Sequence, residues 1–241
     1  MENVMEFVQE LGSETLKNIV SNLKDESAVS AGRTVVDWKL FDRIVINDGV
    51  ASIDGSGNIT AKTGTFQLPQ LINFFNKTAD GTLQGLMVSG NVARINNLVQ
   101  DSKADEPYRF GRLAIDVEVM DCTPDGTDAT KLAVAGGKSA VAIEVYKQIL
   151  NGGKLIVNVN GRDLNYAEPI GFAGSSVAMQ GENTNGVYNK KTPKLIDPAI
   201  YLPEGTTFNA KIAMVNPVVI PANVSVAITV SLLGYKFLKN C

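Results

Sequence analysis

Histidine is absent from this 241-residue sequence, and its absence excludes several kinds of active site. Without an imidazole the chain can hold no Ser-His-Asp triad, no Cys-His pair, no histidine metal ligand and no histidine acid or base. No other tight cluster of reactive residues stands out. We therefore predict a protein without enzymatic activity; an enzyme built on carboxylates, on lysine or on a bound metal is an alternative that stays open.

Cysteine is scarce. The chain has two, Cys122 and Cys241, which are too few for a disulfide framework or for a zinc site made of thiolates. Cys122 follows a strand-like run, and Cys241 is the last residue. We interpret both as free thiols of a reducing compartment, and we predict no cofactor.

Long apolar runs are also missing. No stretch approaches the roughly 18–20 consecutive apolar residues that cross a bilayer, and the first residues lack the basic and apolar regions of a signal peptide. We therefore expect neither a membrane span nor a signal peptide, while contact with a membrane is left open. The 22 Lys and Arg face 25 Asp and Glu, a net charge of −3, which argues against nucleic acid as the main partner.

What the sequence does contain is a globular composition, with 44% hydrophobic and 20% charged residues. A chain of this length can bury a sizeable core and is compatible with a single all-β domain. After Gly32 the sequence pattern changes from helix-like to strand-like. We therefore predict an N-terminal arm over residues 1–32 and one domain over residues 33–241.

An amphipathic helix is predicted over residues 2–24, where apolar side chains recur at spacings of three and four. Gly12 and Ser13 interrupt the pattern and could divide the helix in two. The arm contains six acids and two lysines, so its net charge is −4 and the rest of the chain carries +1. Packaged genome or an anionic lipid surface would repel the acidic arm. An apolar groove on a partner is therefore a better match for the apolar side of the predicted helix. Packing of the arm on its own domain is the alternative. The residues that we predict to make an intersubunit contact are Phe7, Leu11, Leu16, Ile19 and Leu23.

After Gly32 the sequence consists of short β-like runs separated by Gly, Pro, Asn and Asp. Apolar residues alternate with polar ones, which is the period of a strand buried on one face. Asn160 and Gly161 signal a tight turn after one such run. The alternating apolar sets are Val36, Trp38 and Leu40; Leu113, Ile115, Val117 and Val119; Leu155, Val157 and Val159; Phe208, Ala210, Ile212 and Met214; and Val224, Val226, Ile228, Val230 and Leu232.

One further helix is predicted over residues 138–150, ended by Gly152 and Gly153. Loops rich in small polar residues are predicted at 46–58, 120–130 and 179–194. Strands outnumber helices and do not alternate with them. The fold class that we predict is therefore all-β: an antiparallel β-sandwich of jelly-roll type with an N-terminal amphipathic helical arm. The side of the helix predicted to be apolar consists of Val141, Val145, Ile149 and Leu150.

The loop at 120–130 suggests a calcium site, because Asp121, Asp125 and Asp128 surround Gly126. An EF-hand would need Asp or Asn at position 123 and Glu at position 132, where this sequence has threonine and leucine. We therefore predict no metal site but a loop whose Asp side chains bond to their own backbone; weak calcium binding there is left open.

Three other motifs have structural interpretations that we favour. The Gly-Gly-Lys-Ser run at 136–139 lacks the first glycine of a phosphate-binding loop, since Leu132 stands in that place. Asp116 and Glu118 share one face of a strand, which we interpret as a solvated face and not as an acid–base pair. Trp38 and the pair Phe74–Phe75 could line a sugar-binding surface, but we predict that they belong to the core.

Three short sequence segments follow one another in the C-terminal part of the chain in a characteristic order. A strand that starts at Gly153 carries a short polar turn and reaches Asp163. The phrase Leu202-Pro203-Glu204-Gly205-Thr206-Thr207-Phe208 opens the next strand, and the last strand ends in Leu233-Gly234-Tyr235-Lys236-Phe237. Over roughly residues 145–241 the chain thereby resembles the C-terminal half of single jelly-roll capsid proteins from tailless icosahedral bacteriophages. The first half departs from that pattern, notably in the arm and in the run FQLPQLINFFN at 66–76.

The resemblance implies a jelly roll that assembles through many identical contacts. We therefore expect a virion structural protein, a capsid subunit that self-assembles into an icosahedral shell, made in the host cytoplasm and located in the virion. Its expected partners are copies of itself and other virion proteins, without nucleic-acid contact through the acidic arm. A major shell subunit, a minor vertex or decoration protein and a related cellular sandwich all stay open. So does the alternative of a carbohydrate- or ligand-binding β-sandwich module.

Overall fold

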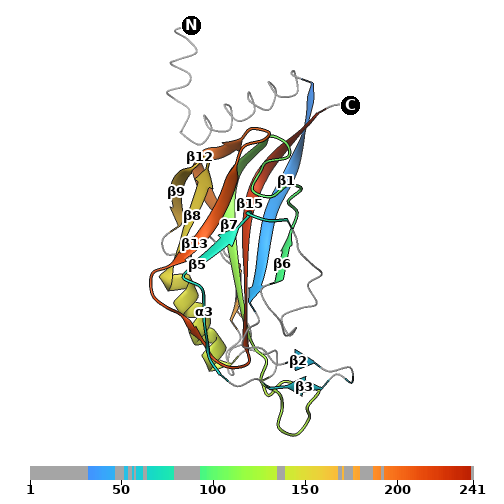
Figure 1. Cartoon of the computed structure of the whole chain (residues 1–241), viewed down its shortest axis with the longest axis vertical. Helices are drawn as coiled ribbons and strands as arrows, with labels where there is room; N and C mark the ends of the chain where they lie inside the picture. The colour runs from blue at the N-terminus through green and yellow to red at the C-terminus, as the bar shows by residue number, and fades with distance from the viewer. Residues whose placement is uncertain are drawn as a thin grey trace.

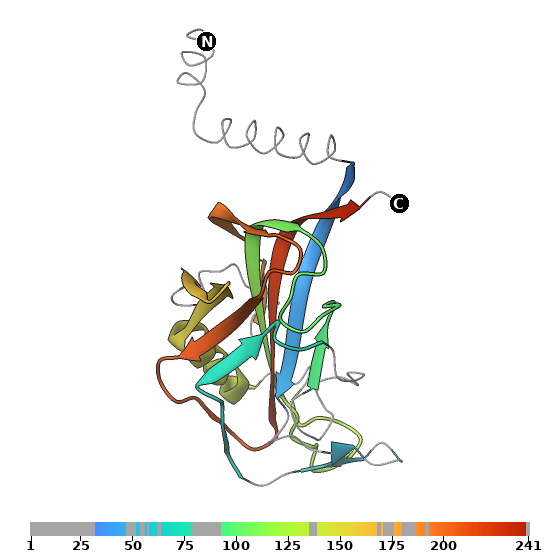
Figure 2. The same ribbon diagram turned by 45° about the horizontal axis from the view of Figure 1, so that its top comes forward.

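The structure is a computed structural model that describes residues 32–46, 52–53, 56, 58–61, 64–78, 93–134, 139–167, 170, 176–179, 187–190 and 193–239. These described residues form antiparallel sheets and one helix (Figures 1 and 2), so the all-β, antiparallel part of the prediction is confirmed. No helix among them is long and apolar enough to pass through a bilayer. The predicted arm lies outside the described residues except for Gly32, and so do its contact residues Phe7, Leu11, Leu16, Ile19 and Leu23.

The larger sheet has five strands in the order β12-β7-β15-β1-β6. The longest strand, β15, pairs with β1 along the whole of β1, from Arg33 opposite Lys239 to Ile46 opposite Val226. The start of β1 and the end of β15 therefore lie side by side at one end of the sheet (Figure 1). The bounds are β12 Lys194–Leu202, β7 Tyr108–Asp121, β15 Val224–Lys239, β1 Arg33–Ile46 and β6 Ala93–Asn96.

The smaller sheet has four strands in the order β5-β13-β8-β9. Three ribbons of two strands accompany the sheets, pairing β2 with β3, β4 with β14 and β10 with β11. The bounds in the sheet are β5 Leu71–Phe74, β13 Phe208–Met214, β8 Gly153–Val159 and β9 Arg162–Ala167. Those in the ribbons are β2 Ser52–Ile53, β3 Ile59–Thr60, β4 Phe66–Gln67, β14 Val219–Ile220, β10 Ser176–Met179 and β11 Val187–Lys190.

The predicted alternation is confirmed in the strands that carry the core. In β13 every second residue is buried, and in β7 the same alternation holds on either side of Gly111 and Arg112, two consecutive residues that are not buried. Asn160 and Gly161 have φ values of 50° and 80°. This conformation belongs to the tight turn that the Asn-Gly pair predicted, and it joins β8 to β9.

A single hydrophobic core joins the two sheets. Its buried residues come from four strands of the larger sheet, from three strands of the smaller sheet and from the helix. Burial of this apolar surface is the main favourable term in folding. The two sheets thus pack against each other as in a β-sandwich (Figure 2).

The helix α3, Ala140–Gly152, starts two residues later than predicted. Ser139 caps it, because its hydroxyl accepts from the Ala142 N–H at 3.2 Å. Val141 is 47% exposed, so its place on the apolar side was wrong. The buried side instead consists of Ala142, Val145, Tyr146 and Ile149.

Gly153 ends the helix with an extended backbone, so it is not required for a left-handed turn. The space around it is tight, since a Cβ there would lie 2.9 Å from Ile170 Cδ1 and 3.0 Å from the carbonyl oxygen of Ile149. Two of the predicted loops also contain strands. Strand β2 lies within 46–58 and β11 within 179–194, and strands of two to four residues are too short to produce a visible alternation.

Candidate functional site

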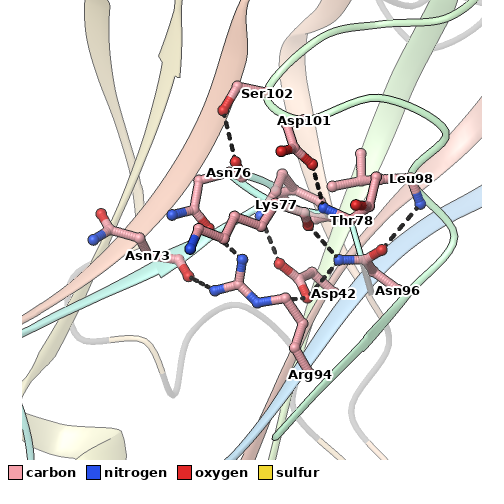
Figure 3. Close-up of polar contacts among 11 residues, drawn as sticks. Asp42, Asn73, Asn76, Lys77, Thr78, Arg94, Asn96, Leu98, Asp101 and Ser102 are labelled. Atoms are coloured by element: carbon pink, nitrogen blue, oxygen red, sulfur yellow. Dashed lines mark hydrogen bonds and ion pairs between the residues drawn. The ribbon is translucent and has the colours of Figure 1, made fainter. Parts of the chain in front are cut away.

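A network of polar side chains ties the larger sheet to the smaller one at β1, β5 and β6 (Figure 3). Its centre is Asp42, which lies between the inward-facing Leu40 and Ile44 of β1 and is 0% exposed. Its Oδ2 accepts from the backbone N–H of Phe75 at 2.6 Å. Its Oδ1 accepts from Asn96 Nδ2 at 3.2 Å. A carboxylate can remain in such a core only because it is paired and hydrogen-bonded.

Arg94 of β6 supplies the opposite charge. Its Nε lies 3.7 Å from Asp42 Oδ1. Its guanidinium also donates to the carbonyl oxygen of Asn73 at 2.8 Å and to the side-chain oxygen of Asn76. These two acceptors lie in and just after β5 (Figure 3). One guanidinium thus bridges strands of both sheets.

Phe75 follows β5 in a left-handed conformation, with φ 58°, which is uncommon for a residue other than glycine. Two contacts hold it there. Its N–H donates to Asp42, and its ring, 0% exposed, packs 5.8 Å from the ring of Phe208. Because the Asp42 carboxylate is enclosed and accepts from the Phe75 N–H and the Asn96 amide, it fixes the relative positions of β1, β5 and β6.

A second cluster lies at the end of the larger sheet where β1 begins. Lys236 is 8% exposed, and its Nζ lies 2.8 Å from Asp105 Oδ2. The same Nζ lies 4.9 Å from the ring centroid of Trp38 and 5.4 Å from that of Tyr108. The Tyr108 hydroxyl donates to Asp105 Oδ1. Cation–π contacts and a carboxylate thus hold a buried lysine in place.

This environment shifts two acidities. Burial acts to raise the pKa of Asp105, but hydrogen bonds from Lys236 and Tyr108 outweigh it, and the net effect lowers that pKa. Burial, with the Asp105 hydrogen bond, raises the pKa of Tyr108. Both residues therefore keep their ordinary charge states near neutral pH, and the cluster holds the strands together without being poised for proton transfer.

The acid sensitivity of the fold should depend on Asp105. Its folded-state pKa lies below the ordinary value, so the ionised carboxylate stabilises the fold above that value, and this contribution is lost as pH falls through the folded-state pKa. We expect Asp105→Asn to show a shallower loss of stability than the parent chain below about pH 4. Urea unfolding at successive pH values measures the slope. Glu204→Gln removes an exposed carboxylate and serves as control; equal slopes in both variants would contradict the assignment.

The loop at 120–130 forms the predicted Asx turns. Asp121, Asp125 and Asp128 each accept from the backbone N–H and the hydroxyl of the threonine two residues later. Lys131 adds an ion pair to Asp128 at 2.7 Å. Within the described part of the chain, no group of three or more Asp, Glu, Cys or His residues is arranged to hold a metal ion.

The other residues singled out in the sequence have structural roles in the core or on the sheet surface. Phe74 and Phe75 are fully buried and Trp38 packs against the core, as predicted. Glu118 makes a two-point ion pair with Arg43, at 2.8 and 3.0 Å, on the outer face of the larger sheet. Cys122 is a free, buried thiol whose pKa burial raises to about 11.

Sequence reasoning missed Asp42, Arg94 and the Lys236 cluster. Asp42 could have been found, because it occupies an inward position of an alternating strand where an apolar residue is expected. Arg94 could not, since it pairs with a residue 52 positions away and β6 has four residues. Comparisons of this chain with protein-family models, with curated proteins and with solved structures gave no match.

Proposed function

We propose that the chain is a virion structural protein, a capsid subunit of jelly-roll fold that self-assembles into an icosahedral shell. Its partners would be copies of itself and other virion proteins, in a virion assembled after synthesis in the host cytoplasm. The observation that carries this proposal is the strand pairing within the two sheets, in which eight of their nine strands form nested pairs.

Numbered along the chain from one to eight, these strands are β1, β5, β7, β8, β9, β12, β13 and β15. The first pairs with the eighth, the second with the seventh, the third with the sixth and the fourth with the fifth. A long antiparallel hairpin folded over into two sheets has this nesting. This nesting supports the proposed jelly roll, a fold that occurs in viral capsid and lectin domains. The strand β6 is an addition at the edge, beside β1.

A fold alone does not define a function, so the surfaces must support it. A shell subunit needs surfaces that meet identical copies and a terminal segment that can dock on a neighbour, which raises the effective local concentration. The acidic, amphipathic sequence of residues 2–24 supplies such a segment. The enclosed networks around Asp42 and Lys236 support a structural role, because their polar groups form hydrogen bonds and ion pairs within the domain.

The alternative, a carbohydrate-binding module, would use exposed aromatic rings as a sugar platform. Among the described residues, Tyr201 is the only aromatic side chain in the set of large exposed hydrophobic residues. A glycan array that yields specific, saturable binding would nevertheless favour this alternative over the capsid proposal.

The first test is the size of the purified full-length chain. We expect light scattering and negative-stain microscopy to show discrete large particles or regular rings. A chain that stays monomeric over a wide range of pH, salt and protein concentration would overturn the proposal.

The predicted contact residues of the arm can be tested with charges. Leu16→Asp with Ile19→Asp places two carboxylates in the apolar stripe, and burial of that stripe then costs several kcal/mol. We expect folded chains that assemble poorly, as we do for deletion of residues 1–27. Asn18→Asp with Ser21→Asp adds the same charge beside the stripe and should leave most assembly intact. If both double variants assemble like the parent, the arm makes no such contact.

A further inference from the structure

The outer surface of the larger sheet carries a patch of basic, aromatic and aliphatic side chains near the start of β1. Cross-strand register aligns two rows, one with Tyr235, Arg109 and Tyr201 and the next with Leu233, Arg112 and Leu195. Their chain neighbours on these strands, such as Tyr108, Leu113 and Leu202, are buried in the core, so the six side chains lie on the opposite face. We call these six residues the outer face.

The outer face is partly open to solvent, with Arg109, Leu233 and Tyr235 half-buried and the other three residues exposed. Leu195 is 63% exposed and Tyr201 is 57% exposed, and Arg112 is exposed as well. Tyrosine and arginine are enriched among the residues that contribute most of the binding energy at protein interfaces. Strand β1 extends the two rows with Lys39 and Asp37. The extended patch therefore has three cations and one carboxylate.

The N-terminal segment is complementary to this surface. Glu2, Glu6 and Glu10 recur every fourth residue ahead of Gly12, so the predicted helix would align three carboxylates along one side. Phe7 and Leu11 belong to the apolar stripe of the same predicted helix. Carboxylates beside apolar side chains match arginines beside Tyr201 and Leu195 in both charge and hydrophobicity.

The chain that links the N-terminal segment to β1 also allows this docking. The segment joins the domain at Arg33, which lies at the same end of the sheet as the outer face, four residues before Asp37. Residues 25–32 can span at most about 27 Å, so the segment starts beside this face and can cross a boundary between adjacent copies.

We propose that residues 2–14 of one chain dock on the outer face of a neighbouring copy, with Glu6 and Glu10 facing Arg109 and Arg112. This inference rests on the proposed self-assembly and names the surface that the arm meets. The segment docks on a neighbouring copy and not on its own domain, because docking on its own domain would cover this face without linking the subunits that the proposed self-assembly requires.

Charge reversal in the full-length chain tests the pairing. We expect Arg112→Glu to raise the concentration needed for assembly about tenfold, which corresponds to about 1.4 kcal/mol. The control Arg162→Glu makes the same change at an exposed residue of β9 in the other sheet and should leave that concentration unchanged. Adding Glu6→Lys and Glu10→Lys to Arg112→Glu should restore assembly, because coupling of this kind identifies groups that interact directly.

Cross-linking identifies the occupant. Tyr201 is replaced by the photo-reactive residue p-benzoylphenylalanine, and isotopically heavy and light chains are mixed before assembly and illumination. We expect mixed heavy–light products that join position 201 to a peptide from residues 2–14. Products only within one isotope, or only to other peptides, overturn the inference.

The two proposals fail in different ways. If the parent chain assembles and Arg112→Glu assembles equally well, the docking surface is wrong while the capsid proposal stands. If the parent chain never assembles, the capsid proposal fails, and docking between copies fails with it.

Discussion

Arg94→Met is expected to lower the free energy of unfolding by about 3–5 kcal/mol, since it leaves the Asp42 carboxylate buried without its opposite charge. Asp42 is 0% exposed and the Arg94 side chain is 10% exposed, so water cannot replace the lost partner. The variant also removes the donors to Asn73 and Asn76. Urea unfolding at neutral pH measures the change.

The double variant Asp42→Asn with Arg94→Met separates the charge from the packing. Asparagine keeps an acceptor for the Phe75 N–H but carries no charge, so the double variant should be more stable than Arg94→Met alone. Glu204→Gln is the matched surface control. Its partner Lys239 is 59% exposed and Glu204 is 44% exposed, and an ion pair of this kind contributes about 0–1 kcal/mol. A loss in Arg94→Met no larger than in this control would refute the bridging role.

Gly234→Ala is expected to abolish folding or to lower the free energy of unfolding by more than about 4 kcal/mol. A loss of this size is exceptional for a single substitution. A Cβ at position 234 would lie 2.0 Å from the carbonyl oxygen of Arg109 and 2.8 Å from Phe110 Cα. Both contacts are with backbone atoms of β7, the adjacent strand, so no side chain can move aside. The register of β15 against β7 shifts at this place, between Leu233 and Gly234.

Gly111→Ala provides the matched control at the same irregularity. Gly111 is the residue of β7 that the register skips, and a Cβ there would meet no atom within 4 Å. We expect it to change the unfolding temperature by a few degrees at most, which corresponds to about 1 kcal/mol. Thermal unfolding and soluble yield compare the two variants. Equal behaviour of the two would mean that the close approach at Gly234 is wrong.

Both predictions concern how the strands are held in place. The capsid proposal requires a domain whose strands keep fixed positions. Asp42 and Arg94 close one edge between the two sheets, and Gly234 permits close approach in the middle of the larger one. If either variant unfolds, assembly cannot be tested with it. The arm variants and Arg112→Glu therefore act on exposed or terminal residues, where stability and assembly can be separated.

Single strands could be read from the sequence because alternation is a local property. Leu113, Ile115 and Val117 are buried in β7, and Phe208, Ala210 and Ile212 in β13, as their period of two predicted. The Asx turns at 120–130 and the Asn160–Gly161 turn were predictable for the same reason, since their hydrogen bonds or φ values involve neighbours in sequence.

What lies between distant segments was not predictable. Both faces of β15 are buried from Val224 to Leu232, in the part of the strand that lies between β7 and β1, whereas its sequence indicated only one apolar face. The place of Asp42 beside Arg94, and of Lys236 between Trp38 and Tyr108, depends on which strands pair and in what register.

The sequence by itself determined the long strands with clear alternation, the tight turn at Asn160 and Gly161, and which active sites histidine's absence excludes. Only the tertiary structure decided the nested order of the strands, the enclosed ion pairs and the alignment of Arg109, Arg112, Leu195 and Tyr201 on one outer face. The physical reason is that alternation and turn chemistry act over a few residues, while pairing is chosen by the burial and hydrogen bonding of the whole chain at once.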